Sequence, residues 1–490
     1  MALISGLLLP AAAPGALAAT YDPTAGDGDV AKQTTGGSTR ERSFEELTAE
    51  DLFSQPIYEV VKADWDKQYK PVTGVSVSVP AVNYTASGGA EDLRRVDNFQ
   101  GRPGQTLVWA NDDGWVEWEV DLPQTGLYEV TVEYFPVSQA VCAGCNGKRA
   151  SVQRDLYIDG ALPFREAKRI VFQRVWREAA WPPKRDNKGQ DIRPAQVEAP
   201  QWETKTLEDA DGRYEQPFQF AFTQGRHKLR METVREPIAI RTITFHAPKV
   251  VPTYQQKLAE WKAMGAKEIS GKSATNPQVR EGVLIEAERL LVKSDPTIRG
   301  EVSFDALADP YSEGLFRLNS FGHWRWRLPG QWARWTINVP EDGLYRISMS
   351  VWQGWSGRRP RIRQLKIDGE VPFKEMQTIL FRSDKDWRLE TMRAEQLPNG
   401  EPFLFYLTKG EHIIQMDVVI GFMTQTVRAI DRSLGEMSTL SRQMLMVTGS
   451  EPDPNMEWDL HEKIPGLLDR LKEISDRLDH EAVRMEEIGR

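Results

Sequence analysis

The 490-residue sequence contains only two cysteines, and no block of lysines and arginines dominates any region. Two cysteines exclude a dense disulfide scaffold. The 62 basic residues are outnumbered by 71 acidic ones, giving a net charge of −9. This balance argues against a nucleic-acid partner, because binding to a phosphate backbone depends on clustered lysine and arginine. The hydrophobic content of 40% is typical of folded domains, and the length indicates about two to four of them.

Long apolar runs are confined to the N-terminus. Residues 3–19 are apolar and end in Ala16-Leu17-Ala18, a spacing that signal peptidase accepts, although a basic start is missing. Two interpretations stay open: a secretory signal peptide over residues 1–19, or a short apolar terminus of the folded chain. No other stretch approaches the ~20 apolar residues that cross a bilayer. We therefore expect an exported protein, extracellular or held at the cell surface.

A linker over residues 20–70 is expected next. Residues 21–42 are rich in glycine, threonine and aspartate, which is typical of flexible segments. Ser43 and Glu46 have the spacing of a capping box, so we expect a short helix over residues 43–62.

Three blocks of sequence occur twice, in the same order. They are "GWVEWEVDLPQTGLYEVTV" and "QWARWTINVPEDGLYRISM", 217 residues apart; "LYIDGALPFREAKRIVF" and "LKIDGEVPFKEMQTILF", 209 apart; and "PFQFAFTQGRHKLRME" and "PFLFYLTKGEHIIQMD", 185 apart. The first copy therefore has 8 extra residues before its second block and 24 more after it. An internal repeat of this kind predicts two domains of the same fold.

Apolar and polar residues alternate within each block, as at Trp118, Val120 and Leu122, which is the period of half-buried strands. Turn residues separate the alternating segments. We predict a mainly β protein with two jelly-roll β-sandwiches over residues 71–250 and 281–425, joined by a helical linker over residues 251–280.

Residues 426–490 show a helical pattern instead. Apolar residues spaced seven apart form two rows, interrupted at Glu481: Leu467, Ile474 and Ile488, and Leu471, Leu478 and Met485. This pattern predicts a helical hairpin or a coiled-coil seam that packs on its own chain or on a partner.

The second copy lacks one strand that the first copy has. In the first copy the third block is followed by "IAIRTITFH" at residues 238–246, whereas the second copy runs directly into helical sequence. Either the helices are inserted before a last strand that lies beyond Arg490, or the second sheet has an open edge. We favour insertion.

Several of these motifs are shared with known families. The segments "DDGWVEWEVDLPQTGLYEVTVEY", "GVLIEAERLL", "GQWARWTINVPEDGLYRISMSV", "LKIDG" and "GEHIIQM" resemble carbohydrate-binding modules with a galactose-binding-like sandwich, over most of residues 71–425. The stretch "LSRQMLMVTGSEPDPNMEWDLHEKIPGLLDRLKEIS" resembles the helical segment after such modules in large extracellular solute-binding proteins of sugar ABC transporters from Gram-positive bacteria.

The resemblance implies a module-bearing N-terminal part of such a protein. It would bind an oligo- or polysaccharide and reach permease subunits through a domain outside this chain. Two alternatives remain: an accessory carbohydrate-binding region of a secreted glycoside hydrolase, and a structural surface protein. Neither a phosphate loop nor a serine-nucleophile elbow occurs in the sequence, and we expect no catalytic activity.

The 16 tryptophans divide into framework and candidate binding positions. Sugar sites stack an aromatic ring on the apolar face of a pyranose. Four tryptophans recur at strand positions of both copies and are assigned to packing: Trp115, Trp118, Trp332 and Trp335. In the second copy we predict carbohydrate binding by four others: Trp352, Trp355, Trp324 and Trp326. The first-copy candidates are Trp109, Trp176, Trp181 and Trp202.

Local sequence supports the choice of the second-copy tryptophans. Trp352 and Trp355 flank a glycine in "VWQGWSG" just after an expected strand, and they are the strongest candidates. The segment "HWRWR" reads as a strand that alternates tryptophan with arginine. For any single tryptophan, burial in the core is the alternative.

Glu286 and Glu288 in "IEAE" are candidate metal ligands. In a strand, residues two apart emerge on the same face, and their hard carboxylate oxygens suit Ca²⁺. The family resemblance implies a structural calcium held by such glutamates and by an aspartate on the last strand, which is missing here. The first copy has Pro80-Ala81-Val82 at the aligned positions and is expected to lack the ion. Two solvated edge carboxylates are the alternative.

Cys142 and Cys145 lie in the extra loop of the first copy. Their spacing is also that of redox motifs and of half a zinc site, but neither a βαβ pattern nor a second cysteine pair accompanies them. In an exported chain we predict a disulfide that closes a small loop.

Overall fold

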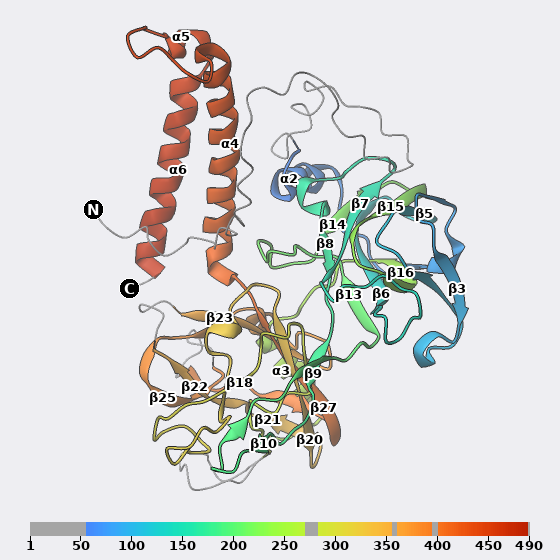
Figure 1. The fold of residues 1–490 in the computed structure, drawn as a ribbon, viewed down its shortest axis with the longest axis vertical. Helices are drawn as coiled ribbons and strands as arrows, with labels where there is room; N and C mark the ends of the chain where they lie inside the picture. Colours follow the sequence, from blue (N-terminus) through green and yellow to red (C-terminus); the bar gives the residue numbers. More distant parts are fainter. Residues whose placement is uncertain (1–54, 270–282, 355–359, 394–399, 489–490) are drawn as a thin grey trace, which may run out of the picture. The chain divides into compact units, whose positions relative to one another are not determined.

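A computed structural model describes residues 55–269, 283–354, 360–393 and 400–488 (Figure 1). Two β-sandwiches follow each other along the chain, joined by helix α3 (Tyr254–Ala263) and followed by a helical hairpin. The predicted mainly β fold is confirmed. The expected signal peptide lies outside the described residues, as does most of the expected helix over residues 43–62. Helix α2 (Tyr58–Gln68) precedes the first sandwich. Among the described helices, none is long and apolar enough to span a membrane.

The first sandwich packs a seven-stranded sheet against a five-stranded one. The larger sheet contains β1 (Ser76–Pro80), β3 (Leu93–Asp97), β4 (Gln105–Trp109), β6 (Gly126–Pro136), β13 (Glu203–Thr206), β14 (Gln219–Phe222) and β16 (Ile238–His246). The smaller sheet runs in the order β2 (Ala86–Gly88), β5 (Trp115–Leu122), β15 (Gly225–Arg235), β7 (Val152–Ile158) and β8 (Ile170–Phe172). One apolar core fills the space between them.

The second sandwich repeats this arrangement with fewer paired strands. One sheet runs through β17 (Val292–Lys293), β20 (Trp332–Val339), β27 (Gly410–Val418), β23 (Arg361–Ile367) and β24 (Ile379–Phe381). The remaining strands form three separate pairs: β18 (Gly300–Glu301) with β19 (Ser320–Phe321), β21 (Gly343–Tyr345) with β26 (Phe405–Leu407), and β22 (Ser348–Gln353) with β25 (Asp384–Thr391).

Matching contacts occur in both copies of the repeated sequence. The buried indole of Trp118 donates a hydrogen bond to the carbonyl of Ala81 at 2.7 Å, and Trp335 donates to Ala287 at 2.8 Å. Both framework positions therefore belong to the cores, as predicted. The alignment of Ala287 with Ala81 also places the "IEAE" segment opposite the first copy's Pro80-Ala81-Val82.

The extra residues of the first copy reach the sheet of the second sandwich. They form β9 (Trp176–Glu178), β10 (Lys184–Arg185), β11 (Asp191–Ile192) and β12 (Gln196–Glu198). Strand β9 pairs with β17, and β12 pairs with β9. The second-sandwich sheet that runs from β17 to β24 therefore gains two strands from the first copy. The buried ammonium group of Lys293 bonds Glu178 at 2.8 Å across this junction.

Helices α4 (Thr424–Thr448) and α6 (Leu467–Ile488) lie side by side and antiparallel, with short α5 (Leu460–Lys463) between them (Figure 1). Leu440, Leu467 and Ile474 are buried in their seam. Glu481, which interrupts the apolar pattern, is buried and accepts hydrogen bonds from Thr426 at 2.8 Å and Arg484 at 2.7 Å. The predicted helical hairpin is confirmed.

Candidate functional site

An open pocket of about 310 Å³ lies in the second sandwich and is lined mainly by aromatic side chains. The lining residues are Val302, Ser303, Phe304, Asp305, His323, Trp324, Trp352 and Trp387. Indole and phenyl faces beside a carboxylate and a hydroxyl group can bind a ligand that is apolar on one face and polar at its edges.

Paired strands hold two of the three indoles. Trp352 lies on β22 and Trp387 on β25, and these strands pair antiparallel. The indole nitrogen of Trp352 donates a hydrogen bond to the Lys385 carbonyl at 2.9 Å, which fixes the ring's orientation. The ring centroids of Trp352 and His323 lie 6.3 Å apart.

The neighbourhood of His323 is charged. Burial lowers the pKa of His323, and Arg193 and Arg325 lower it further against the opposing effect of Glu301, so the imidazole is neutral at pH 7. Arg325 contacts Glu301 at 2.6 Å, and Arg299 lies 3.5 Å from the same carboxylate. These ion pairs connect the segments beside the pocket that contain Arg299, Glu301 and Arg325.

The corresponding region of the first sandwich is filled. Trp202 and Phe135 are the repeat counterparts of Trp387 and Trp352. Their rings pack together with centroids 5.6 Å apart, and Phe99 packs on both. The Cys142–Cys145 disulfide belongs to the same apolar cluster. The extra loop therefore covers the surface that is open in the second sandwich.

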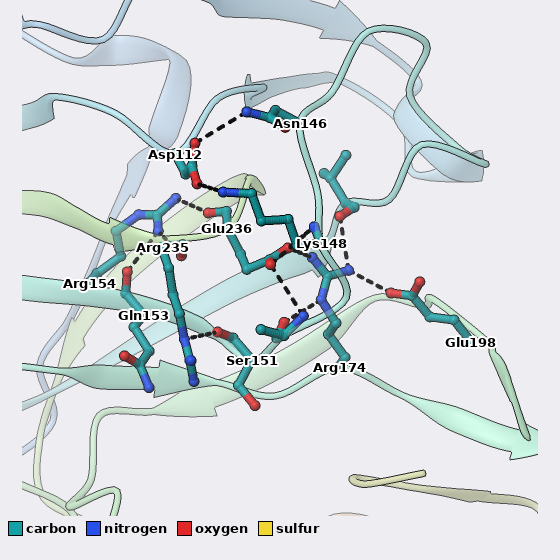
Figure 2. A network of polar contacts seen from close by, with 12 residues as sticks. Asp112, Asn146, Lys148, Ser151, Gln153, Arg154, Arg174, Glu198, Arg235 and Glu236 are labelled. Atoms are coloured by element: carbon teal, nitrogen blue, oxygen red, sulfur yellow. Dashed lines mark hydrogen bonds and ion pairs between the residues drawn. The ribbon is translucent and has the colours of Figure 1, made fainter. Parts of the chain in front are cut away.

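A buried ionic network fastens this covering loop (Figure 2). The Glu236 carboxylate accepts hydrogen bonds from the backbone nitrogens of Lys148 at 2.9 Å and Ala150 at 3.2 Å. Arg174 bridges Glu236 at 2.7 Å and Glu198 at 2.5 Å (Figure 2). Arg174 and Glu236 are 1% and 2% exposed, so water competes little for these bonds.

The structure brings together two of the four predicted second-copy tryptophans. Trp324 (59% exposed) and Trp352 line the pocket. Trp355 lies outside the described residues. Trp326 does not line the pocket: its ring packs against Phe321 and Trp335, beneath the guanidinium group of Arg363 at 4.2 Å.

The arginine over Trp326 has an equivalent in the first sandwich, where Arg154 lies 4.5 Å from the ring centroid of Trp109. The spacing of both residues matches the repeat, so Trp109 and Trp326 are framework positions. The expectation that "HWRWR" is a strand is wrong, because residues 323–325 form a 3₁₀ helix. Of the other first-copy candidates, Trp176 is buried on β9, and Trp181 is half-buried outside the strands.

The sequence prediction missed Trp387. Its position follows from the third repeat block, because a spacing of 185 residues aligns it with Trp202. The same alignment pairs two hydroxyl contacts across the strands, Thr131 with Thr206 at 2.8 Å and Ser348 with Thr391 at 2.9 Å.

Glu286 and Glu288 lie in a segment without strand structure, which corrects the expectation of a strand. Glu288 is buried and Glu286 is exposed. Burial raises the pKa of Glu288 to about 7, and the nearby charges of Glu286 and Asp309 contribute in the same direction. Within the described ranges, no group of three or more His, Cys, Asp or Glu side chains has the arrangement of a metal site.

Residues 425–490, which contain the hairpin, match the family model of the bacterial solute-binding protein 4-helix bundle domain. No curated protein sequence matches the chain significantly. Similar solved structures include the C-terminal family 6 carbohydrate-binding module of a marine laminarinase from Zobellia galactanivorans, at 10% identity and TM-score 0.21, covering 35% of this chain and 99% of that one.

A family 35 carbohydrate-binding module from Clostridium thermocellum is 15% identical, with TM-score 0.22, over 36% of this chain and 100% of that one. A Podospora anserina mannanase with a family 35 module is 11% identical, with TM-score 0.21, over 40% of this chain and 36% of that one. Likenesses at this level carry no argument, and the fold rests on the sheets and registers above.

Proposed function

We propose that the second sandwich binds an oligo- or polysaccharide, without catalysis, in the pocket formed by Trp324, Trp352 and Trp387. The open aromatic pocket is the observation that carries this proposal. The flat apolar face of a pyranose stacks on an indole, while Ser303 and Asp305 offer partners for hydroxyl groups. The volume is at the small end of the range for small-molecule sites and suits one or two sugar units of a longer glycan.

We also propose that the chain is part of an extracellular solute-binding protein of a sugar ABC transporter, which contacts the permease subunits through a domain outside this chain. The match of residues 425–490 to the bundle domain of bacterial solute-binding proteins supports this role. The apolar residues 3–19 support export. The sandwich would then keep a glycan close to the domain that captures the released sugar.

The test compares two tryptophans at equivalent positions. A glycan array identifies a ligand, and calorimetry measures its Kd for the wild type, Trp387→Ala and Trp202→Ala. A sugar face that covers roughly 60 Å² of indole contributes ~1.5 kcal/mol, or about tenfold in Kd. We expect Trp387→Ala to weaken binding by about this factor.

Trp202→Ala is the matched control, because Trp202 packs against Phe99 and Phe135 in the closed first sandwich. It should lower the melting temperature and leave Kd unchanged. Absence of binding to any glycan refutes the proposal, and so does an equal loss of affinity in both variants.

We propose in addition that Glu286 and Glu288 contribute to a structural calcium site. The charges of Glu286 and Asp309 act unfavourably on the buried carboxylate of Glu288, and a bound cation would offset this repulsion. The remaining ligands would be backbone oxygens or water, since the described side chains form no complete site. Calcium should raise the melting temperature of the wild type over that in chelator, whereas Glu288→Gln should show no such rise. An equal rise in both proteins refutes the site.

A further inference from the structure

The last strand of the first sandwich, β16, has no counterpart among the described residues of the second. In the first sandwich β16 pairs with β6, β4 and β1 at once. The repeat places the counterparts of their paired residues at 346–353, 324–326 and 282–286.

Among the described residues, none of these three segments pairs with a strand at that position. The described partner of β22 is β25, residues 323–325 form a 3₁₀ helix, and residues 283–286 have no regular structure. All three elements that pair with β16 in the first copy thus lack the corresponding pairing in the second, although β22 keeps its pairing with β25. A missing central strand explains all three differences, because each of these segments would pair with it or lie beside it.

The apolar surface that β16 covers is also less buried in the second copy. The core-facing residues Val130, Val132 and Tyr134 of β6 are at most 3% exposed. Their counterparts Ile347, Met349 and Val351 are only half-buried. Strand β16 covers this surface in the first copy with four apolar residues that are 0–1% exposed: Ile238, Ile240, Ile243 and Phe245.

The helical hairpin starts and ends where this strand would begin. Helix α4 begins at Thr424, just after β27, whereas the first sandwich turns directly from β15 into β16. Helix α6 then runs back to the start of α4. Arg484 near the end of α6 donates a hydrogen bond to the Phe422 carbonyl at 3.3 Å. The hairpin thus returns the chain to the end of β27.

We propose that a strand of the same polypeptide, following α6, completes the second sandwich by pairing antiparallel with β22. The strand lies between β22 and residues 324–326, as β16 lies between β6 and β4. Its sequence alternates apolar and polar residues as "IAIRTITFH" does. The hairpin is then an insertion between the last two strands of a sandwich, and both ends of the insertion are held by the sheet.

The experiment adds this strand to the full chain. The segment "IAIRTITFH" is fused after Arg490 through a flexible linker of about ten glycine and serine residues. A control extension replaces its apolar inward residues by aspartate. Calorimetry follows the melting of the second sandwich, and hydrogen exchange follows the backbone amides of β22.

We expect the apolar extension to raise the melting temperature by on the order of 5–10 °C and to protect the amides of β22, and the aspartate extension to do neither. A Met349→Asp variant of the extended chain should lose the gain. The proposal is overturned if both extensions behave alike. It is also overturned if the unextended chain forms dimers with protected β22 amides, because a second copy then fills the position. No glycan enters these measurements, so the result is independent of the proposed sugar site.

Discussion

Glu236→Gln removes the central carboxylate of the buried network that fastens the loop over the first sandwich (Figure 2). The substitution leaves Arg174, which is 1% exposed, with Glu198 as its only ionic partner in the network. It also turns an amide group toward backbone N–H donors that the carboxylate satisfied. Breaking a buried ion pair costs about 3–5 kcal/mol. Because Glu198 still pairs with Arg174 in the variant, we expect a loss near the lower value.

A loss of about 3 kcal/mol corresponds to about 6–12 °C in the melting temperature of a domain of 150–250 residues. Calorimetry of the full chain measures this shift, and hydrogen exchange at Lys148 and Ala150 reports whether the loop opens. Asp112→Asn is the control, because its ion-pair partner Lys148 is 70% exposed, and a shift below about 1 kcal/mol is expected. Equal melting temperatures for the two variants, or unchanged exchange at both amides, would refute the reasoning.

Two further predictions concern a buried acid and the helical seam. Burial raises the pKa of Glu129 to about 7, partly offset by Lys249, so stability should fall as pH rises from about 4.5 to 7. Glu129→Gln should remove about 3 kcal/mol of this dependence. Denaturant unfolding gives the free energy of unfolding of both proteins. A wild-type minus variant difference that stays constant between about pH 4.5 and 8 contradicts the prediction. In the hairpin, Leu440→Ala should cost about 2–5 kcal/mol, because Leu440 is 1% exposed, whereas Met446→Ala (79% exposed) should be neutral. Circular dichroism during thermal unfolding checks this pair, and similar losses in both variants would count against the seam.

Alternation and repetition carried most of the information about the fold. The three repeated blocks correspond to paired strands in both sandwiches. Of the four tryptophans shared by the two copies, Trp118, Trp332 and Trp335 are buried, whereas Trp115 is only half-buried. The same alignment also pairs Trp387 with Trp202, so a comparison of the two copies would have identified Trp387 as a candidate binding residue. The heptad spacing of Leu467 and Ile474 predicted the helical seam, including the break at Glu481.

The two incorrect strand predictions differ in their cause. In the first copy, the residues aligned with "IEAE" already begin a 3₁₀ helix, at Ala81–Asn83. The "HWRWR" segment has a strand-like local pattern, but a strand also needs a neighbour for its backbone groups. In the first sandwich β16 supplies that neighbour, and in the second no described strand does. Local sequence carries no information on this missing partner.

Residue order alone thus determined the two sandwiches and the helical hairpin, because strand and helix periods arise from local geometry. The tertiary structure decided which copy is open. Trp202 and Trp387 are equivalent in sequence, yet one is covered by Phe99 and Phe135 and the other lines a pocket. The tertiary structure also placed β9 and β12, from the longer segment of the first copy, in the sheet of the second. Exposure depends on neighbours that are distant along the chain, and only the folded chain brings these together.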